Sequence, residues 1–201
     1  MSIAACRLLA GLILGLLLLG AVTPVLPLPA ADPSAAPNGS GLKASTSGDP
    51  RRFDATQRES LRRLETEMWE RINRERTARA NQAETGGHAR PLKWDEHLAR
   101  VARAHSQDMA ARGFFSHTSP EGQSPIERLY NAGILWPSIA ENIARKSDAS
   151  QIGSSFIHQP PFQPNHRANI LNPHFTHVGI GVVRGPDALF YITQEFAQED
   201  R

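Results

Sequence analysis

Histidine is the residue type in this sequence best suited to chemistry, because 8 are present and four lie in the last quarter of the chain. His117 follows two aromatic residues and precedes a Ser-Pro turn, and His166 follows a proline-rich stretch. Glu141 is the single carboxylate of the apolar stretch 139–144, where its charge needs a histidine or a cation as partner. Two histidines and one glutamate can hold a divalent cation and leave one position open to water. Their spacing does not by itself show that they converge.

Other routes to chemistry are missing from the sequence. It contains no G-x-S-x-G, H-E-x-x-H, Walker A or G-x-G-x-x-G motif. The single cysteine, Cys6, precedes an apolar run and is lost if that leader is removed. A hydrolase with Glu141 as base, and a histidine or metal-bound water as partner, is therefore a hypothesis without an evident nucleophile.

Hydrophobic periodicity predicts the elements that must position these residues. The predicted helices cover residues 55–81, 96–112, 125–132, 147–158 and 166–171, and the predicted strands cover residues 139–144, 177–184 and 189–196. Helices followed by strands in hairpin succession predict an α+β fold with an antiparallel sheet covered by helices.

Local signals mark the ends of two of these helices. Asp95 is suited to cap the second helix, and Gly113 follows its last residue. Ser124 and Glu127 form an S-x-x-E capping box, with a proline at the first helical position of the third helix. His105 lies on the apolar stripe of the second helix, where it is either a core residue or a group behind the polar site.

The N-terminal quarter of the chain is predicted to lie outside the folded domain. Residues 1–31 have the charged start, apolar centre and small-residue exit of a secretory signal peptide, and an uncleaved anchor is the alternative. Residues 32–54 are rich in Pro, Ser and Gly and are predicted to form a flexible linker. Residues 55–201 form the predicted domain, and the protein is expected to be extracellular or periplasmic.

Composition excludes several classes of protein. The 22 Lys and Arg residues against 20 Asp and Glu residues leave a net charge of +2, which is too small for a nucleic-acid binder. A single cysteine excludes an internal disulfide and a multi-cysteine zinc site. The expected product is a monomer that has no stable membrane span once its leader is cleaved.

Four motifs occur in order along the chain and carry a resemblance to a known family. They are Phe-Ser-His-Thr-Ser-Pro at 115–120, Ala-Glu-Asn-Ile-Ala at 140–144, His-Arg-Ala-Asn-Ile-Leu at 166–171 and His-Val-Gly-Ile-Gly-Val at 177–182. Together they resemble the CAP domain, also called the SCP domain, of cysteine-rich secretory proteins, antigen 5 and the pathogenesis-related class 1 plant proteins. The lack of cysteine after the leader is similar to the bacterial exported branch of that superfamily.

The resemblance implies an α-β-α sandwich with a central cleft. In the family two histidines and two glutamates line this cleft, and in some members they bind Zn²⁺ or another divalent cation. By motif, His117 and His166 correspond to the two histidines and Glu141 to one glutamate. The resemblance therefore makes these three the candidate metal ligands and ligand-binding residues, and also the catalytic residues if any reaction occurs.

The second glutamate of the family has no acidic counterpart, since none lies between Ala149 and His166. If Phe156 replaces a tryptophan of the family, Gln159 falls near the missing glutamate and becomes a further candidate ligand-binding residue. Three ligands should hold zinc more weakly than four, unless His158 supplies the fourth.

Three functions remain open. The first is an exported domain whose His/Glu cleft binds a divalent cation or a small ligand at the cell surface, with His105 and Gln159 as additional candidates. The second is a non-catalytic module for lipid, sterol or cell-wall polymer, with the 156–164 loop as contact surface. The third is the Glu/His-dependent hydrolase.

Overall fold

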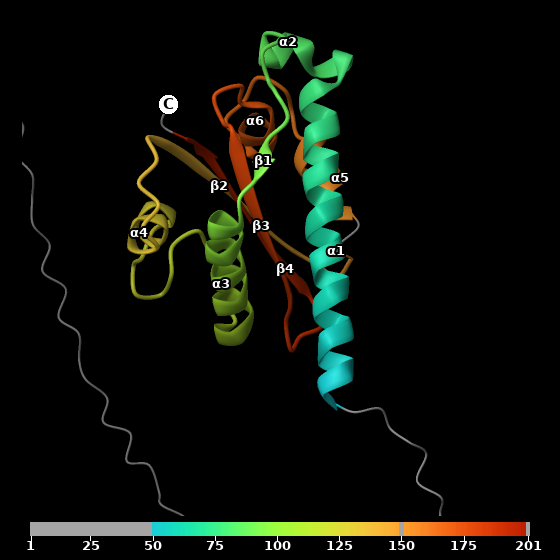
Figure 1. Cartoon of the computed structure of the whole chain (residues 1–201), viewed down its shortest axis with the longest axis vertical. Helices are drawn as coiled ribbons and strands as arrows, with labels where there is room; N and C mark the ends of the chain where they lie inside the picture. The colour runs from blue at the N-terminus through green and yellow to red at the C-terminus, as the bar shows by residue number, and fades with distance from the viewer. Residues whose placement is uncertain (1–49, 149–150, 200–201) are drawn as a thin grey trace, which may run out of the picture. The chain divides into compact units, whose positions relative to one another are not determined.

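The computed structural model describes residues 50–148 and 151–199 (Figure 1). The predicted leader, residues 1–31, lies outside this part of the chain, and so does most of the predicted linker. Residues 50–54, which were predicted as linker, belong to the first helix. None of the helices in the described part is long and apolar enough to cross a membrane.

Helices and strands alternate in groups along the chain. The helices are α1 (Pro50–Thr77), η1 (Arg79–Asn81), α2 (Gln82–Thr85), α3 (Glu96–Arg112), α4 (Pro125–Asn131), α5 (Ile152–Ile157) and α6 (His166–Leu171). The strands are β1 (Lys93–Trp94), β2 (Ser138–Lys146), β3 (His177–Arg184) and β4 (Phe190–Gln198).

Two predicted helices differ in extent from the observed ones. The helix predicted over 55–81 ends at Thr77, because Ala78 takes an extended conformation and a 3-10 turn follows. The helix predicted over 147–158 is α5, which is shorter. Its predicted start is wrong because Ser147 and Asp148, which follow directly after β2, are not helical, and α5 begins at Ile152.

The predicted caps of α3 and α4 are confirmed. The side chain of Asp95 accepts a hydrogen bond of 2.8 Å from the backbone N–H of Leu98, and Gly113 closes α3 with a φ of 70°. Ser124 and Glu127 form both hydrogen bonds of the capping box at the start of α4. These local devices determine where the loop between α3 and α4, which carries His117, begins and ends.

The sheet has the strand order β1-β3-β4-β2. β4 pairs antiparallel with β3, as the hairpin pattern predicts. Its other edge pairs antiparallel with β2, so β2 and β3 are not neighbours in the sheet. The short β1 pairs parallel with β3, so the sheet is not purely antiparallel. In the β2–β4 ladder Glu141 lies directly opposite Glu195, which places two carboxyl groups side by side.

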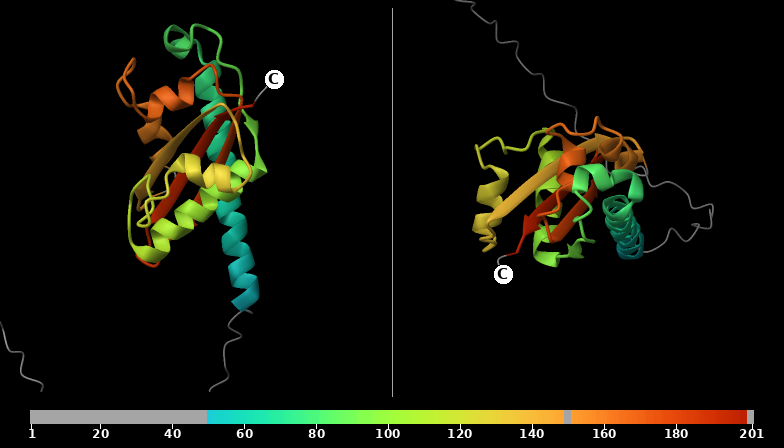
Figure 2. Two further views of the ribbon diagram at one scale, coloured as in Figure 1. Left: turned by 90° about the vertical axis from the view of Figure 1, so that its left-hand side faces the viewer. Right: turned by 90° about the horizontal axis from the view of Figure 1, so that it is seen from above.

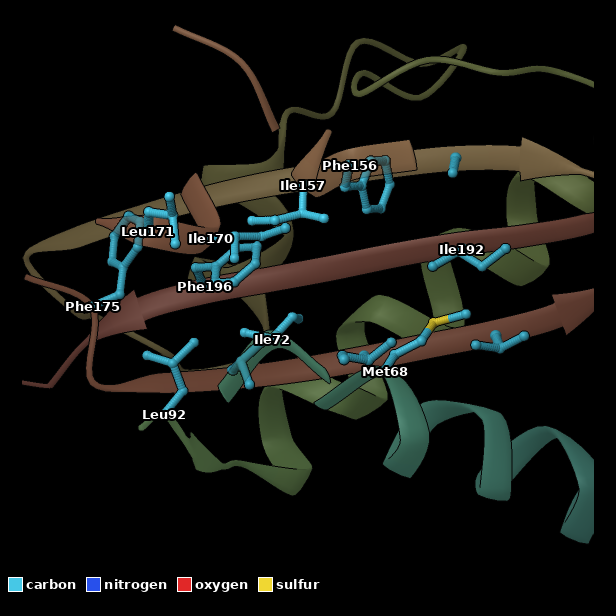
Figure 3. Close-up of a cluster of buried hydrophobic side chains, with 14 residues drawn as sticks. Met68, Ile72, Leu92, Phe156, Ile157, Ile170, Leu171, Phe175, Ile192 and Phe196 are labelled. Carbon is cyan, nitrogen blue, oxygen red and sulfur yellow. The ribbon is translucent and has the colours of Figure 1, made fainter. Parts of the chain in front are cut away.

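Helices cover both faces of this sheet, which confirms the α-β-α arrangement (Figure 2). On one face, α1, α5 and α6 bury a large apolar cluster against β3 and β4, and Figure 3 shows members such as Met68, Phe156 and Ile170. On the other face, α3 and α4 bury residues such as Leu98, Met109 and Leu129. Burial on both faces makes the sheet a rigid support for the loops at its edge.

α3 approaches the sheet closely because β3 has glycine at the contact positions. A Cβ at Gly179 would lie 2.1 Å from the backbone nitrogen of Ala99, and one at Gly181 would lie 2.2 Å from that of Arg103. Neither distance leaves room for a side chain. The alternation of valine and isoleucine with glycine in β3 therefore sets one face for the core and the other for direct backbone contact with α3.

Candidate functional site

The site is built around Glu141 on β2, whose side chain is only 2% exposed. Its Oε1 lies 2.6 Å from Nδ1 of His117, which the loop after α3 holds with half of its side chain exposed. The sequence predicted that a charge in this apolar strand needs a histidine or a cation as partner. Glu141 has both.

The cation is Arg128 on α4, which sequence reasoning missed. Its Nη2 binds Oε2 of Glu141, and its Nη1 donates to the backbone carbonyl of His117 at 2.8 Å. Only 8% of the Arg128 side chain is exposed. The arginine therefore fixes both the carboxylate and the loop that carries the histidine. Its position in a predicted amphipathic helix contained no signal for this role.

Two opposing effects act on the pKa of Glu141. Burial raises it, but the hydrogen bond with His117 and the charge of Arg128 outweigh burial and lower the pKa overall. Glu141 is therefore ionised at neutral pH and accepts hydrogen bonds from both partners.

Glu195 on β4 is a second buried carboxyl group behind the site. It is fully buried and lies directly beside Glu141 in the β2–β4 ladder. Burial, and then the negative charge of Glu141, raise the pKa of Glu195 well above its usual range and so favour its protonated form. A glutamate in the otherwise uncharged strand predicted over 189–196 was the signal that could have identified it.

His105 is buried in α3 and lies behind Glu141. Its Nε2 is 3.0 Å from the carbonyl oxygen of Ser116 and 4.0 Å from Oε2 of Glu141, while its Nδ1 has no partner in the described residues. Burial lowers its pKa. It is a core histidine that contacts the back of the site and does not line the pocket.

His166 is the first residue of α6, and Gln159 holds its ring from the preceding loop. Nε2 of Gln159 lies 2.8 Å from Nδ1 of His166, and Oε1 of Gln159 accepts the backbone N–H of His166 at 2.9 Å. The ring of Phe156 packs at 4.6 Å from the ring of His166. Burial, and then the charge of His117, lower the pKa of His166.

The two histidines meet in one open pocket of about 620 Å³. The structure thus brings together His117, Glu141, His166 and Gln159. Prolines and amides complete the wall: Pro160, Gln163, Pro164, Asn165 and Asn169.

The remaining sequence candidates lie elsewhere. His158 is exposed and does not line the pocket, so it does not replace the missing glutamate. Within the 156–164 loop, Phe162 is 74% exposed and has a φ of 58°, and its backbone N–H donates to Glu84 of α2. The loop therefore forms one wall of the pocket and is tied to α2.

Metal binding by all three predicted ligands does not fit this arrangement. Both oxygens of Glu141 already have partners, and the Arg128 guanidinium compensates its charge. Across the described residues, no three His, Cys, Asp or Glu side chains are grouped so that they could hold a metal ion. Zn²⁺ sites in proteins use three or four protein ligands, and here two imidazoles remain.

Comparison with known proteins places the chain in a family. Residues 69–196 match the CAP family, described as the cysteine-rich secretory protein family. Two similar proteins of Bacillus subtilis (strain 168) are the uncharacterized protein YkwD, 39% identical over 95 residues, and the uncharacterized membrane protein YlbC, 34% identical over 106 residues. The matches cover 47% and 52% of this chain but only 35% and 28% of those proteins, so the chain spans about a third of their length.

Solved structures agree on the fold. An extracellular protein containing a SCP domain from Bacillus anthracis is 27% identical, with a TM-score of 0.54 over 70% of this chain and 43% of its own. An outer surface protein from Borrelia burgdorferi has the same TM-score of 0.54 over 72% of this chain and 96% of its own, and at 15% identity it supports the fold alone. Since the family match covers most of the described domain, the chain belongs to the CAP, or cysteine-rich secretory protein, family.

Proposed function

We propose that this chain is an extracellular CAP-domain protein whose pocket binds a small polar ligand through His117 and His166. One observation carries the proposal. Two imidazoles from distant segments line the same open pocket, and a hydrogen bond at Nδ1 orients each ring. Orienting a ring costs conformational freedom and is useful when the other nitrogen, Nε2, has a ligand to meet.

An extracellular location is supported by two independent indications. The first 31 residues have the pattern of a secretory signal peptide. The similar protein from Bacillus anthracis is described as extracellular. A monomeric state remains a prediction, to be tested by the molar mass of the purified protein in solution.

The lining of the pocket favours a polar ligand over a lipid or a sterol. Apart from two prolines, every lining residue is a histidine, a glutamate or an amide. A bound sterol or acyl chain would bury these polar groups without hydrogen-bond partners, at a cost of about 1–3 kcal/mol for each group.

The proposal can be tested by NMR on protein produced from the full-length sequence with ¹⁵N-labelled histidine. Acetate, inorganic phosphate, ethanolamine and N-acetylglucosamine serve as probes. At least one should shift the side-chain signals of both His117 and His166, and the affinity should fall at least tenfold in His117→Ala or His166→Ala. His158→Ala is the matched control, because this exposed histidine lies outside the pocket. Binding that survives both pocket variants would contradict the proposal.

A hydrolase is the second candidate, and one contact favours it. A carboxylate at Nδ1 of a half-exposed histidine is the arrangement that orients a general base, so His117 is the base and Glu141 its orienting partner. The nucleophile would be water, because no serine, threonine or cysteine of the described residues lines the pocket. Hydrolysis of an ester, peptide or glycan substrate should then disappear in His117→Gln, and activity that persists in this variant would exclude the mechanism.

A further inference from the structure

The hydrogen bonds of Gln159 determine which ring nitrogen of His166 carries the proton. The backbone N–H of His166 is a donor, so the amide atom that faces it at 2.9 Å must be Oε1 of Gln159. The other end of the amide, Nε2, then faces the ring, 2.8 Å from Nδ1. Because an amide nitrogen only donates, Nδ1 accepts, and the neutral ring has its proton on Nε2.

His117 is held in the opposite tautomer. Its Nδ1 faces Oε1 of Glu141 at 2.6 Å, and an ionised carboxylate only accepts. In the neutral ring of His117, Nδ1 therefore carries the proton and Nε2 has a free lone pair. Neither Nε2 atom is hydrogen-bonded to another residue of the described ranges, so the pocket contains one imidazole acceptor and one imidazole donor.

This pairing explains why Gln159 matters for metal binding. An imidazole ligand needs a lone pair on the coordinating nitrogen, and it normally donates its other N–H to an acceptor such as a carboxylate. His117 meets both requirements. His166 meets neither, because Gln159 donates to the nitrogen that would have to be protonated.

We propose that Gln159, by fixing His166 as a donor opposite the acceptor His117, makes the pocket a binding site for a neutral, hydroxyl-rich ligand such as a sugar and not for a divalent cation. This inference rests on the proposed function and names the ligand class. A hydroxyl group can both donate and accept, so a ligand with several hydroxyl groups can accept from Nε2 of His166 and donate to Nε2 of His117.

The rest of the pocket fits the same ligand class. Gln163, Asn165 and Asn169 line it, and amide side chains carry both donors and acceptors, as hydroxyl groups do. Within the described part of the chain, Glu141 is the only carboxylate that lines the pocket, and Arg128 compensates its charge. Without an uncompensated charge, the pocket does not favour an anion or a cation over a neutral molecule.

The decisive variant is Gln159→Glu, which keeps the shape of the side chain and replaces the donor by an acceptor. The carboxylate can still accept the backbone N–H of His166, and it can now accept from Nδ1 as well. The lone pair of His166 then moves to Nε2. Outer-sphere partners of this kind change metal affinity about 10–100-fold, so Zn²⁺ affinity measured by calorimetry should rise by about that factor.

Gln163→Glu is the matched control, because it adds the same charge to the pocket wall without a hydrogen bond to His166. It should leave Zn²⁺ affinity within about threefold of the wild type. The ¹⁵N shifts of the imidazole should report Nε2 of His166 as protonated in the wild type and as unprotonated in Gln159→Glu. Glucose, N-acetylglucosamine and their short oligomers should shift both histidines in the wild type, with about tenfold lower affinity in Gln159→Glu.

Several results would overturn the inference. The first is an unprotonated Nε2 of His166 in the wild type. The second is a Zn²⁺ affinity that is equal in the wild type and in Gln159→Glu. The third is a gain in Zn²⁺ affinity in Gln163→Glu as large as that in Gln159→Glu. If acetate or phosphate shifts both histidines and no sugar does, the ligand class is wrong and the proposed function stands. If neither His117→Ala nor His166→Ala lowers the affinity for any probe, the proposed function itself fails.

Discussion

Replacing Arg128 by methionine should destabilise the domain strongly, because it removes the cation from a buried ion pair. Only 8% of the Arg128 side chain and 2% of the Glu141 side chain are exposed. The variant keeps the aliphatic part of the side chain but leaves the carboxylate without its guanidinium, and it removes the donors to the carbonyls of His117 and Gln123. Removing one partner of a buried pair costs about 3–5 kcal/mol. We expect the free energy of unfolding to fall by that amount.

Urea denaturation followed by tryptophan fluorescence measures this loss. The matched control is Arg112→Met, because Arg112 also binds two carboxylates, those of Asp108 and Glu121, but is 38% exposed. Exposed pairs contribute about 0–1 kcal/mol, so the control should unfold close to the wild type. Since the cost in Arg128→Met comes from a stranded charge, the double variant Arg128→Met/Glu141→Gln should recover at least half of the loss.

Two outcomes would refute this reasoning. One is an Arg128→Met domain within about 1 kcal/mol of the Arg112→Met control, which would mean that Glu141 is solvated or paired in another way. The other is a double variant that is no more stable than Arg128→Met, which would mean that the loss comes from the carbonyl hydrogen bonds and not from the carboxylate.

Three further predictions concern buried residues of the domain. Gly181→Ala should lower the melting temperature, because its Cβ would lie 2.2 Å from the backbone nitrogen of Arg103 and overpacking costs about 1–3 kcal/mol; an unchanged melting temperature would contradict the close contact. Burial raises the pKa of Glu195 in the folded protein above the usual glutamate value of 4.5. The free energy of unfolding of the wild type should therefore fall as the pH rises from 4.5 towards the raised pKa, because only the unfolded chain then loses this proton readily. Glu195→Gln removes this loss, and its advantage in urea unfolding should grow with pH; a constant difference would argue against a protonated Glu195. Arg76→Met should lower the free energy of unfolding, measured by chemical denaturation, by about 3 kcal/mol. Arg76 is 2% exposed, burial lowers its pKa to about 10, and its guanidinium donates to four backbone carbonyls. A loss under about 1 kcal/mol would show that water can replace the guanidinium.

Local patterns predicted most of the secondary structure. The apolar spacing of α1 and α3, the capping box at Ser124 and the alternation in β3 are properties of neighbouring residues, so they are visible without the fold. The errors lie at the ends of elements, because contacts with distant segments determine where a helix or strand stops. β2 continues to Lys146 because Phe190 pairs with it, and no residue near Lys146 signals this partner.

The three residues first identified in the site were found because each contradicts its surroundings or belongs to a motif. A carboxylate in an apolar strand must have a partner, because burying an unpaired charge costs free energy, and this follows from the sequence alone. Arg128 could not be identified in this way. Glu195 could have been, because it is the single charged residue of the strand predicted over 189–196, but its contact with Glu141 could not. They matter because α4 and β4 bring them next to Glu141, and their sequence separation contains no trace of that contact.

The sequence by itself determined that the chain carries a CAP domain after a leader-like segment, and that His117, Glu141 and His166 are its unusual polar residues. The tertiary structure decided what those residues can do. Whether an imidazole donates or accepts depends on the atom that faces its other nitrogen, and at His166 that atom is the amide nitrogen of Gln159. Hydrogen-bond direction is a property of contacts in space, and for this reason the character of the pocket emerged only from the folded chain.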